Sequence, residues 1–321
     1  MDFYIKEQLC KQYNLNSLTK VSLLHGGENQ TYIFESDKNK FVVRQYREGR
    51  YTAEQIEAEI HWLIALQKQM LVPEVVVNKD GDWVTPVMKD EGSIQYFVVF
   101  RFINGSEIIE PKDKDYEKLG ALMRMFHEKT NGVLKRVSQT WRGYERPIYS
   151  EQKMIHESLQ CLLNTSFLSY EDKNKCLRIA ERIQELTNSI QLGEKQFVHG
   201  DMHFGNILVD KEDWYLLDFD ECGFGYKEFD IGVPRLHLIA SGQLENAWGN
   251  FMMGYGENIS ESAIRLGTAS RIFYMAGKIP LRLDIEPIRK KPDAFIRRYI
   301  QYVEEELCGE TIVSLKNRIL I

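Results

Sequence analysis

The densest group of chemically capable side chains lies between residues 199 and 220. The segment His-Gly-Asp-Met-His-Phe-Gly-Asn carries a carboxylate at Asp201 and, five residues later, an amide at Asn206. Another carboxylate, Asp218, follows twelve residues after Asn206 and opens the sequence Asp-Phe-Asp. A positioned carboxylate can accept the proton of a hydroxyl group, while amide and carboxylate oxygens are ligands that Mg²⁺ prefers. The spacing predicts phosphoryl transfer, with Asp201 as catalytic base and Asn206 and Asp218 as metal ligands.

Two histidines in the same segment suggest a different chemistry. His199 and His203 stand four residues apart, and on a helix such a pair can share one metal ion, as in metal-dependent hydrolases. Gly200 and Gly205 disfavour a helix here. We therefore expect a loop, in which the two histidines do not share a metal ion and His203 lines the cleft or has no particular role.

The composition excludes several other classes of protein. The 321 residues carry a formal net charge of −6, and neither the first hundred residues nor the remainder is basic, so nucleic-acid binding has no electrostatic support. The five cysteines are scattered without a Cys-x-x-Cys pair, which favours reduced thiols. The sequence has neither an apolar run of roughly 18 residues nor a visible signal peptide. We expect a cytoplasmic protein without nucleic-acid or membrane partners.

The first hundred residues predict a small antiparallel sheet with one helix. Short runs rich in Val, Ile, Phe and Tyr are separated by turn residues, which is typical of strands. A capping-box pattern at 52–55 opens a helix that ends before Pro73. The strands are expected at 17–24, 29–36, 40–46, 74–77, 83–88 and 95–102.

The remainder predicts a larger, mainly helical part. Leu119, Leu122, Met123 and Phe126 follow helical spacing. Long helices are expected at 151–166 and 171–190, short strands at 197–199, 207–209 and 214–217, and helix boundaries at Pro234, Pro280, Pro287 and Pro292. The predicted fold class is α+β, with an N-terminal lobe over 1–103 and a C-terminal lobe over 104–321.

The combined motifs resemble the aminoglycoside phosphotransferase/choline kinase superfamily, which is related to the protein kinases. The segment 218–226, followed by Phe-Asp-Ile-Gly at 229–232, is similar to a narrower bacterial group that includes homoserine kinase type II and stress-response Ser/Thr kinases. The resemblance runs along the whole chain in order. It implies a bilobal protein-kinase-like fold that binds ATP and Mg²⁺ and transfers the γ-phosphoryl group to a hydroxyl.

The resemblance also assigns nucleotide-binding residues. Gly26, Gly27 and Asn29 occupy the turn that covers the phosphates, and the backbone at Phe100 and Phe102 occupies the hinge that reads adenine. Arg44 stands where the family usually has a lysine that grips the phosphates. Because a guanidinium fork differs in shape from an ammonium, this departure changes the expected geometry. Its expected partner is Glu59 in preference to Glu57. At least one of these two acids is expected to lie on a solvated helix face.

Other residues receive supporting roles. The resemblance makes His199 and Asp230 structural supports of the catalytic loop, and Asp220, Glu221 and Tyr226 lie near enough in sequence to reach the acceptor. Residues 141–146 suit a substrate lid. For these residues, and for Asp220, Glu221 and Tyr226, ordinary packing or a surface position is the simpler interpretation. The late arginines at 265, 271, 282, 297 and 298 are expected to form helical salt bridges.

The motifs are compatible with several kinds of phosphoryl acceptor. An amino alcohol such as homoserine or serine, or an aminoglycoside or amino sugar, suits an acidic protein. A protein Ser/Thr acceptor of the stress-response type is an alternative. A pseudokinase or coat-type binding protein, which keeps the fold without catalysis, is another alternative.

Overall fold

The computed structural model describes residues 1–16, 19–26, 29–36, 39–89 and 92–308. The chain divides into two compact units. The first comprises Met1–Ile108, Val133–Arg146 and Ile207–Asp220, and the second comprises Ile109–Gly132, Pro147–Asn206 and the residues from Glu221 onward. Both units draw on separate stretches of the chain, and a lobe boundary at 103/104 stays a prediction.

The first unit contains the expected antiparallel sheet. Its strand order is β1-β2-β3-β6-β4, and β5 also pairs with β6. The strands are β1 (Lys20–Gly26), β2 (Gln30–Glu35), β3 (Lys40–Gln45), β4 (Val75–Val76), β5 (Val84–Met88) and β6 (Ile94–Arg101). A second sheet of order β10-β9-β7 consists of β7 (Ser106–Glu107), β9 (Ile207–Asp210) and β10 (Asp213–Leu216).

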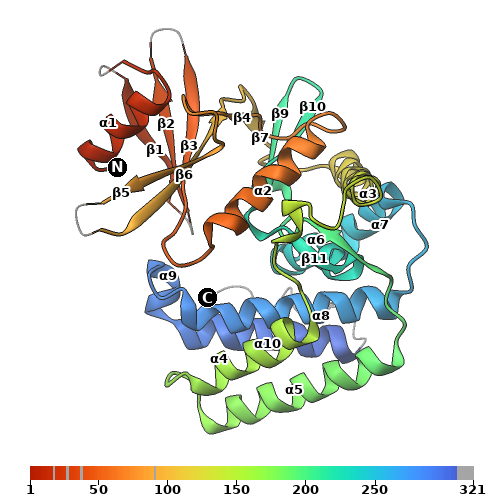
Figure 1. The fold of residues 1–321 in the computed structure, drawn as a ribbon. Helices are drawn as coiled ribbons and strands as arrows, with labels where there is room; N and C mark the ends of the chain where they lie inside the picture. The colour runs from red at the N-terminus through yellow and green to blue at the C-terminus, as the bar shows by residue number, and fades with distance from the viewer. Residues whose placement is uncertain (17–18, 27–28, 37–38, 90–91, 309–321) are drawn as a thin grey trace. The chain divides into compact units, whose positions relative to one another are not determined.

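The prediction of one helix in the N-terminal part is wrong, because α1 (Phe3–Gln12) precedes the sheet. Asp2 caps this helix by accepting a hydrogen bond from the Tyr4 N–H. Ile5 and Leu9 pack with core residues of the strands, and Figure 1 shows α1 beside the sheet. The segment has too few apolar positions for a clear helical period, so this tertiary packing, which the sequence pattern does not reveal, stabilises the helix.

Helix α2 (Ala53–Leu66) begins with the expected capping box, in which Thr52 and Gln55 satisfy each other's backbone N–H groups. It ends at Leu66, earlier than the pattern indicated. The Trp62 indole donates a hydrogen bond to the Gly143 carbonyl, and the Trp141 ring lies 4.7 Å from the Trp62 ring. Residues 141–146 thus pack against α2, which favours the packing interpretation over a substrate lid.

The second unit is built around α8 (Glu261–Lys278), most of whose residues are buried. It packs against α6 (Lys227–Ser241), α10 (Pro292–Cys308) and α4 (Ser158–Asn164). The other helices are α3 (Asp113–Leu134), α5 (Tyr170–Ser189), α7 (Leu244–Tyr255) and α9 (Glu286–Lys290). A two-stranded antiparallel sheet pairs β8 (Lys195–Val198) with β11 (Gly223–Tyr226). Among the described helices, none has the length and apolarity to span a membrane.

Two expectations for this unit are wrong in detail. The segment 151–166 begins with a π-helical turn at Gln152–Glu157 before α4, and Pro234 lies inside α6 instead of ending a helix. A proline there removes one helical hydrogen bond, but buried residues on both sides of Pro234 pack this helix into the core. The short strands β7 and β11 were not predicted. Strand β7 has only two residues, and two of the four residues of β11 are glycine, which is depleted in strands.

Two glycines allow α3 and α7 to cross closely. A Cβ on Gly120 would lie 2.0 Å from the Phe251 carbonyl oxygen, and a Cβ on Gly254 would lie 1.8 Å from the Glu117 carbonyl oxygen. Backbone atoms cannot yield as a side chain can, so larger residues would force the helices apart.

We expect Gly254→Ala to lower the free energy of unfolding by about 1–3 kcal/mol, measured by denaturant titration. The matched control on the same helix is Gly249→Ala, where an added Cβ meets nothing within 4 Å. That change should raise stability by about 0.5–1 kcal/mol, because alanine is the better helix former. Equal effects of the two substitutions would contradict the close crossing.

Candidate active site

A buried carboxylate on α6 fixes the loop that carries Asp201. Asp230 Oδ2 accepts a hydrogen bond from the His199 N–H at 2.9 Å, and its Oδ1 accepts one from the Gly200 N–H at 2.8 Å. His127 Nε2 lies 2.9 Å from the same carboxylate. Burial acts to raise the pKa of Asp230, but the His127 contact outweighs it and lowers the pKa below its usual value. The structure thus places Asp230 as a backbone anchor, while Tyr226 occupies the N-cap of α6.

The conformation of this loop requires glycine at position 200. Gly200 has a φ of +78°, and a Cβ there would lie 2.4 Å from the Glu221 carbonyl oxygen. The neighbouring His199 is fully buried, and its Nδ1 accepts a hydrogen bond from the Asp201 N–H at 3.3 Å. His199 thus shapes the loop around Asp201, in line with a supporting role.

The Asp201 carboxylate lies at the centre of a polar cluster. Its Oδ2 is 3.2 Å from Asn206 Nδ2 and 3.6 Å from His203 Nε2. Its Oδ1 accepts from Arg271 Nη2 at 3.3 Å. The His203 ring stacks on the His237 ring with a centroid distance of 4.1 Å. The side chain of Asp201 remains 31% exposed, so a ligand can reach it.

This cluster keeps Asp201 ionised. Burial acts to raise its pKa, but the His203 contact and the charge of Arg271 hold the pKa well below its usual range. Burial lowers the pKa of His237 to about 4, so that ring is neutral near pH 7. An ionised carboxylate can accept a hydrogen bond from a hydroxyl group and orient it for reaction.

Sequence reasoning missed the role of Arg271. Of the late arginines, Arg297 pairs with Asp172 and Asp293 on the surface, as expected for helical salt bridges. Arg271 instead lies buried at 2% exposure against Asp201. The sequence of α8 nevertheless contains a signal, because Arg271 stands amid small and apolar residues. An arginine in such surroundings is rarely buried without a specific partner.

In the first unit, Arg44 joins two carboxylates. From β3 its Nη1 donates to Glu59 Oε1 at 3.2 Å, and its Nη2 lies 3.1 Å from Asp218 Oδ1. Although burial acts to lower it, Asp218 and Glu59 raise the pKa of Arg44 above its usual value. Glu59 is fully buried, whereas Glu57 pairs with the exposed Arg142. The structure therefore pairs Arg44 with Glu59, as expected, and not with Glu57.

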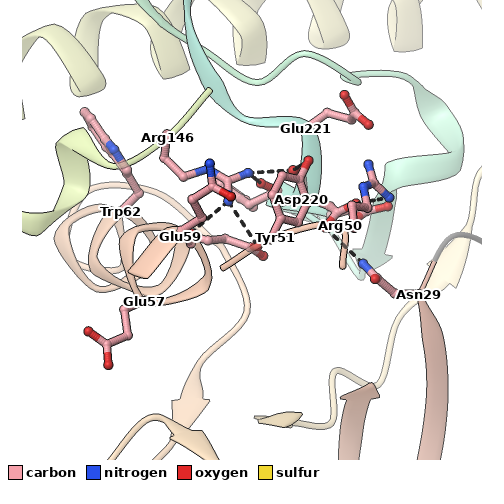
Figure 2. A network of polar contacts seen from close by, with 12 residues as sticks. Asn29, Arg50, Tyr51, Glu57, Glu59, Trp62, Arg146, Asp220 and Glu221 are labelled. Carbon is pink, nitrogen blue, oxygen red and sulfur yellow. Dashed lines mark hydrogen bonds and ion pairs between the residues drawn. The ribbon is translucent and has the colours of Figure 1, made fainter. Parts of the chain in front are cut away.

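A second buried arginine, Arg146, supports the same helix acid (Figure 2). Its Nη1 lies 3.8 Å from Glu59 Oε2 and donates to the Gln55 carbonyl. Its Nη2 donates to the carbonyls of Phe219 and Asp220. Burial raises the pKa of Glu59, and Arg44 and Arg146 act against that rise. The two arginines thus offset the cost of burying this carboxylate.

Asp220 serves this network rather than an open acceptor site (Figure 2). Its Oδ1 accepts from Asn29 Nδ2 at 3.0 Å, and its Oδ2 lies 2.7 Å from Arg50 Nη1. Asn29 Oδ1 accepts from the Arg47 N–H at 3.0 Å. These contacts favour structural roles for Asp220 and Asn29 over contact with acceptor or phosphate. Gly26 ends β1, and Gly27 lies outside the described residues.

The proposed acceptor contacts Glu221 and Tyr226 are also engaged. Glu221 Oε1 accepts from Lys278 Nζ at 2.6 Å, and its Oε2 accepts from the Tyr149 hydroxyl at 3.1 Å. Tyr226 pairs with Lys195 at the end of the β8–β11 ladder opposite the end that leads into the catalytic loop. Both arrangements favour packing roles.

The hinge residues differ in their surroundings. Phe100 is buried in β6, between Val42 of β3 and Val75 of β4. Phe102 follows the end of that strand, and Lys40 Nζ lies 4.1 Å above its ring. Phe102 is therefore the first residue after β6. Its backbone is expected to form hydrogen bonds with the adenine edge, and that contact stays a prediction.

The predicted metal ligands belong to different units, Asn206 to the second and Asp218 to the first. Among the described residues, the hydrogen bonds of the Asn206 side chain use Nδ2, which leaves its amide oxygen for a cation. The Asp218 carboxylate is 41% exposed. An amide oxygen and a carboxylate fit the preferences of Mg²⁺, and the site as a whole stays a prediction.

Comparison with known proteins points to one family. Residues 21–256 match the phosphotransferase enzyme family (APH). An uncharacterized protein of Synechocystis is 23% identical over 251 residues, which are 76% of this chain and 67% of that protein. Stress response kinase A of Escherichia coli K12 is 25% identical over 188 residues, which are 58% of this chain and 53% of the kinase. This chain therefore spans about half the length of that kinase.

Solved structures share the fold. A microcompartment-associated aminopropanol kinase superposes with a TM-score of 0.77 at 20% identity, covering 95% of both chains. An amicoumacin kinase in complex with AMP-PNP, Ca²⁺ and Ami also gives a TM-score of 0.77, at 18% identity, covering 97% of this chain and 94% of that one. The α+β kinase-like fold expected from the sequence is confirmed.

We expect Glu59→Gln to lower the free energy of unfolding by roughly 3–5 kcal/mol, because it leaves Arg44 and Arg146 without their buried counter-charge. The matched control is Glu57→Gln on the same helix, whose loss of a surface ion pair should cost less than about 1 kcal/mol. Denaturant titration of both variants measures the difference. An unchanged free energy of unfolding in Glu59→Gln would show that the buried pair contributes little to the stability of the fold.

Proposed function

Because this chain belongs to the phosphotransferase enzyme family, we propose that it transfers the γ-phosphoryl group of ATP, with Mg²⁺, to a hydroxyl group of a small molecule. The observation that carries the proposal is the Asp201 carboxylate, held ionised by His203 and Arg271. The loop that presents it is fixed by Asp230. A rigid, ionised carboxylate beside an amide with a spare oxygen is what this transfer requires of the protein.

Asp201 acts by orienting the acceptor. The acceptor hydroxyl donates a hydrogen bond to the carboxylate, and its oxygen attacks the γ-phosphorus of ATP. A new oxygen–phosphorus bond forms, the bond to the β–γ bridging oxygen breaks, and ADP leaves. The hydroxyl proton passes to Asp201 and then to solvent. Since the pKa of Asp201 is low, it takes the proton only as the new bond forms, and most of its effect is positional.

The first unit supplies the nucleotide side. Arg44, held by Glu59, would grip the phosphates with a guanidinium fork that matches phosphate oxygens. Gly26, at the end of β1, would approach the phosphates, and the backbone near Phe102 would read the adenine. An ATP analogue is bound in the amicoumacin kinase, which supports a nucleotide in this fold.

Asn206 and Asp218 would hold Mg²⁺ through their oxygens. The cation supplies charge neutralisation on the β- and γ-phosphates during transfer. Arg44 contacts Asp218, so its guanidinium would orient that carboxylate for the metal. A Ca²⁺ ion accompanies the analogue in the amicoumacin kinase, which supports a divalent-cation requirement.

The acceptor class follows the small-molecule members of the family. Aminopropanol and amicoumacin kinases share the fold, and they support an amino alcohol such as homoserine or serine, or an amino sugar, as acceptor. The similarity to stress response kinase A favours a Ser/Thr protein acceptor as the second candidate.

Asp201→Asn should lower kcat for phosphoryl transfer by about 10²–10⁴-fold, because an amide cannot orient and deprotonate the acceptor. Transfer from γ-labelled ATP with Mg²⁺ to a panel of amino alcohols, aminoglycosides, sugars and a generic protein measures this. The matched control is Asp213→Asn on the exposed end of the β9–β10 hairpin, which should behave as the wild type.

A thermal-shift assay with ATP and Mg²⁺ accompanies the transfer assay, since bound ligand raises apparent stability. Both variants should keep the shift. Full turnover in Asp201→Asn would refute the proposed role of this residue. ATP binding without transfer to any acceptor would favour a pseudokinase.

A further inference from the structure

Arg271 has hydrogen-bonding capacity that the protein does not use. Its Nη2 contacts Asp201, but its Nε and Nη1 atoms are buried and find no hydrogen-bond partner among the described residues. Leaving donors of a buried cation unpaired is costly, and most buried polar groups in native proteins are paired. The guanidinium therefore has donors to spare for a ligand that binds beside Asp201.

Aromatic rings hold this guanidinium without consuming its donors. Its Cζ lies 5.4 Å from the Phe229 ring centroid and 5.7 Å from that of Tyr274. Such cation–π contacts stabilise the charge and fix its orientation. Together with the Asp201 contact, they hold the guanidinium in place before a ligand arrives, which lowers the entropic cost of binding.

Arg271 brings a positive charge to Asp201, because its Nη2 lies 3.3 Å from Asp201 Oδ1. The acid Glu221, which also acts on Arg271, is engaged by Lys278. An acceptor with several ammonium groups would meet a like charge at Arg271, whereas an anionic group would meet an opposite one.

We propose that Arg271 reads a carboxylate on the acceptor, so that the preferred substrates are small hydroxy acids or hydroxy amino acids. A carboxylate presents two oxygens in the plane that a guanidinium fork recognises. The contact between Arg271 and Asp201, at 3.3 Å, places a carboxylate reader within a few bonds of the hydroxyl that Asp201 orients. The proposal rests on the proposed function, and it narrows the acceptors considered there to those that carry a carboxylate.

Pairs of acceptors that differ only by a carboxylate test this directly. The pairs are L-serine with ethanolamine, L-homoserine with 3-aminopropan-1-ol, and L-threonine with 1-aminopropan-2-ol. For at least one pair, the wild-type chain should prefer the acid by about 10²-fold or more in kcat/KM, as sites with buried polar readers discriminate strongly. Arg271→Met should abolish this preference, chiefly by raising KM for the acid.

Further variants separate recognition from folding. Arg271→Lys keeps the charge but loses the fork, so its preference should be intermediate. Arg297→Met, which removes an exposed arginine paired with Asp172, should keep the wild-type preference. Circular dichroism establishes that each variant is folded.

Two kinetic outcomes would overturn the inference. One is a wild type that prefers no acid in any pair. The other is an equal loss of kcat for both members of a pair in Arg271→Met, which would assign Arg271 to the transferred phosphoryl group or to the positioning of Asp201.

Calorimetric titration of the same six compounds, in the presence of a non-hydrolysable ATP analogue and Mg²⁺, separates the inference from the proposed function. Absence of transfer to the whole acceptor panel, these six compounds included, would count against the proposed function. Acid-selective binding that Arg271→Met abolishes would still support the inference, and absence of such binding would overturn it.

Discussion

The hydrogen bonds that the Asp230 carboxylate accepts from the His199 and Gly200 backbones are the constraint on which the site depends. They convert the segment between β8 and β9 into a rigid loop, and the left-handed Gly200 lets it pass the Glu221 carbonyl. The fixed backbone in turn presents Asp201 to His203 and Arg271. Because these groups hold the pKa of Asp201 low, the fold keeps the carboxylate that we propose to be catalytic ionised before any substrate binds.

A buried carboxylate also organises the polar contacts of the first unit. There a buried carboxylate, Glu59, lies between Arg44 and Arg146, and Arg44 extends the chain of charges to Asp218. Removing either partner of such a pair leaves an uncompensated buried charge. The stability of the first unit and its proposed nucleotide contacts therefore depend on the same side chains, and the guanidinium fork of Arg44 reaches a second carboxylate, Asp218.

Much of the fold and part of the site could be predicted from sequence, because both depend on local patterns. Alternating strands, the capping box at Thr52 and the spacing of Asp201 and Asn206 all act over a few residues. Helix α1 could not be foreseen, since its stability comes from packing on strands distant in sequence. The same holds for Arg146 and Arg271, whose partners lie 74 and 70 residues away, and for Asp220, whose partner Asn29 lies 191 residues away.

The proposed function depends on the movement of phosphate from ATP to a hydroxyl group. Phosphorus NMR of the chain with ATP, Mg²⁺ and the acceptor panel measures this transfer, because each product has its own resonance. We expect a new phosphomonoester signal that grows in step with ADP. Growth of ADP with inorganic phosphate alone, or an unchanged ATP spectrum while ATP is bound, would contradict it.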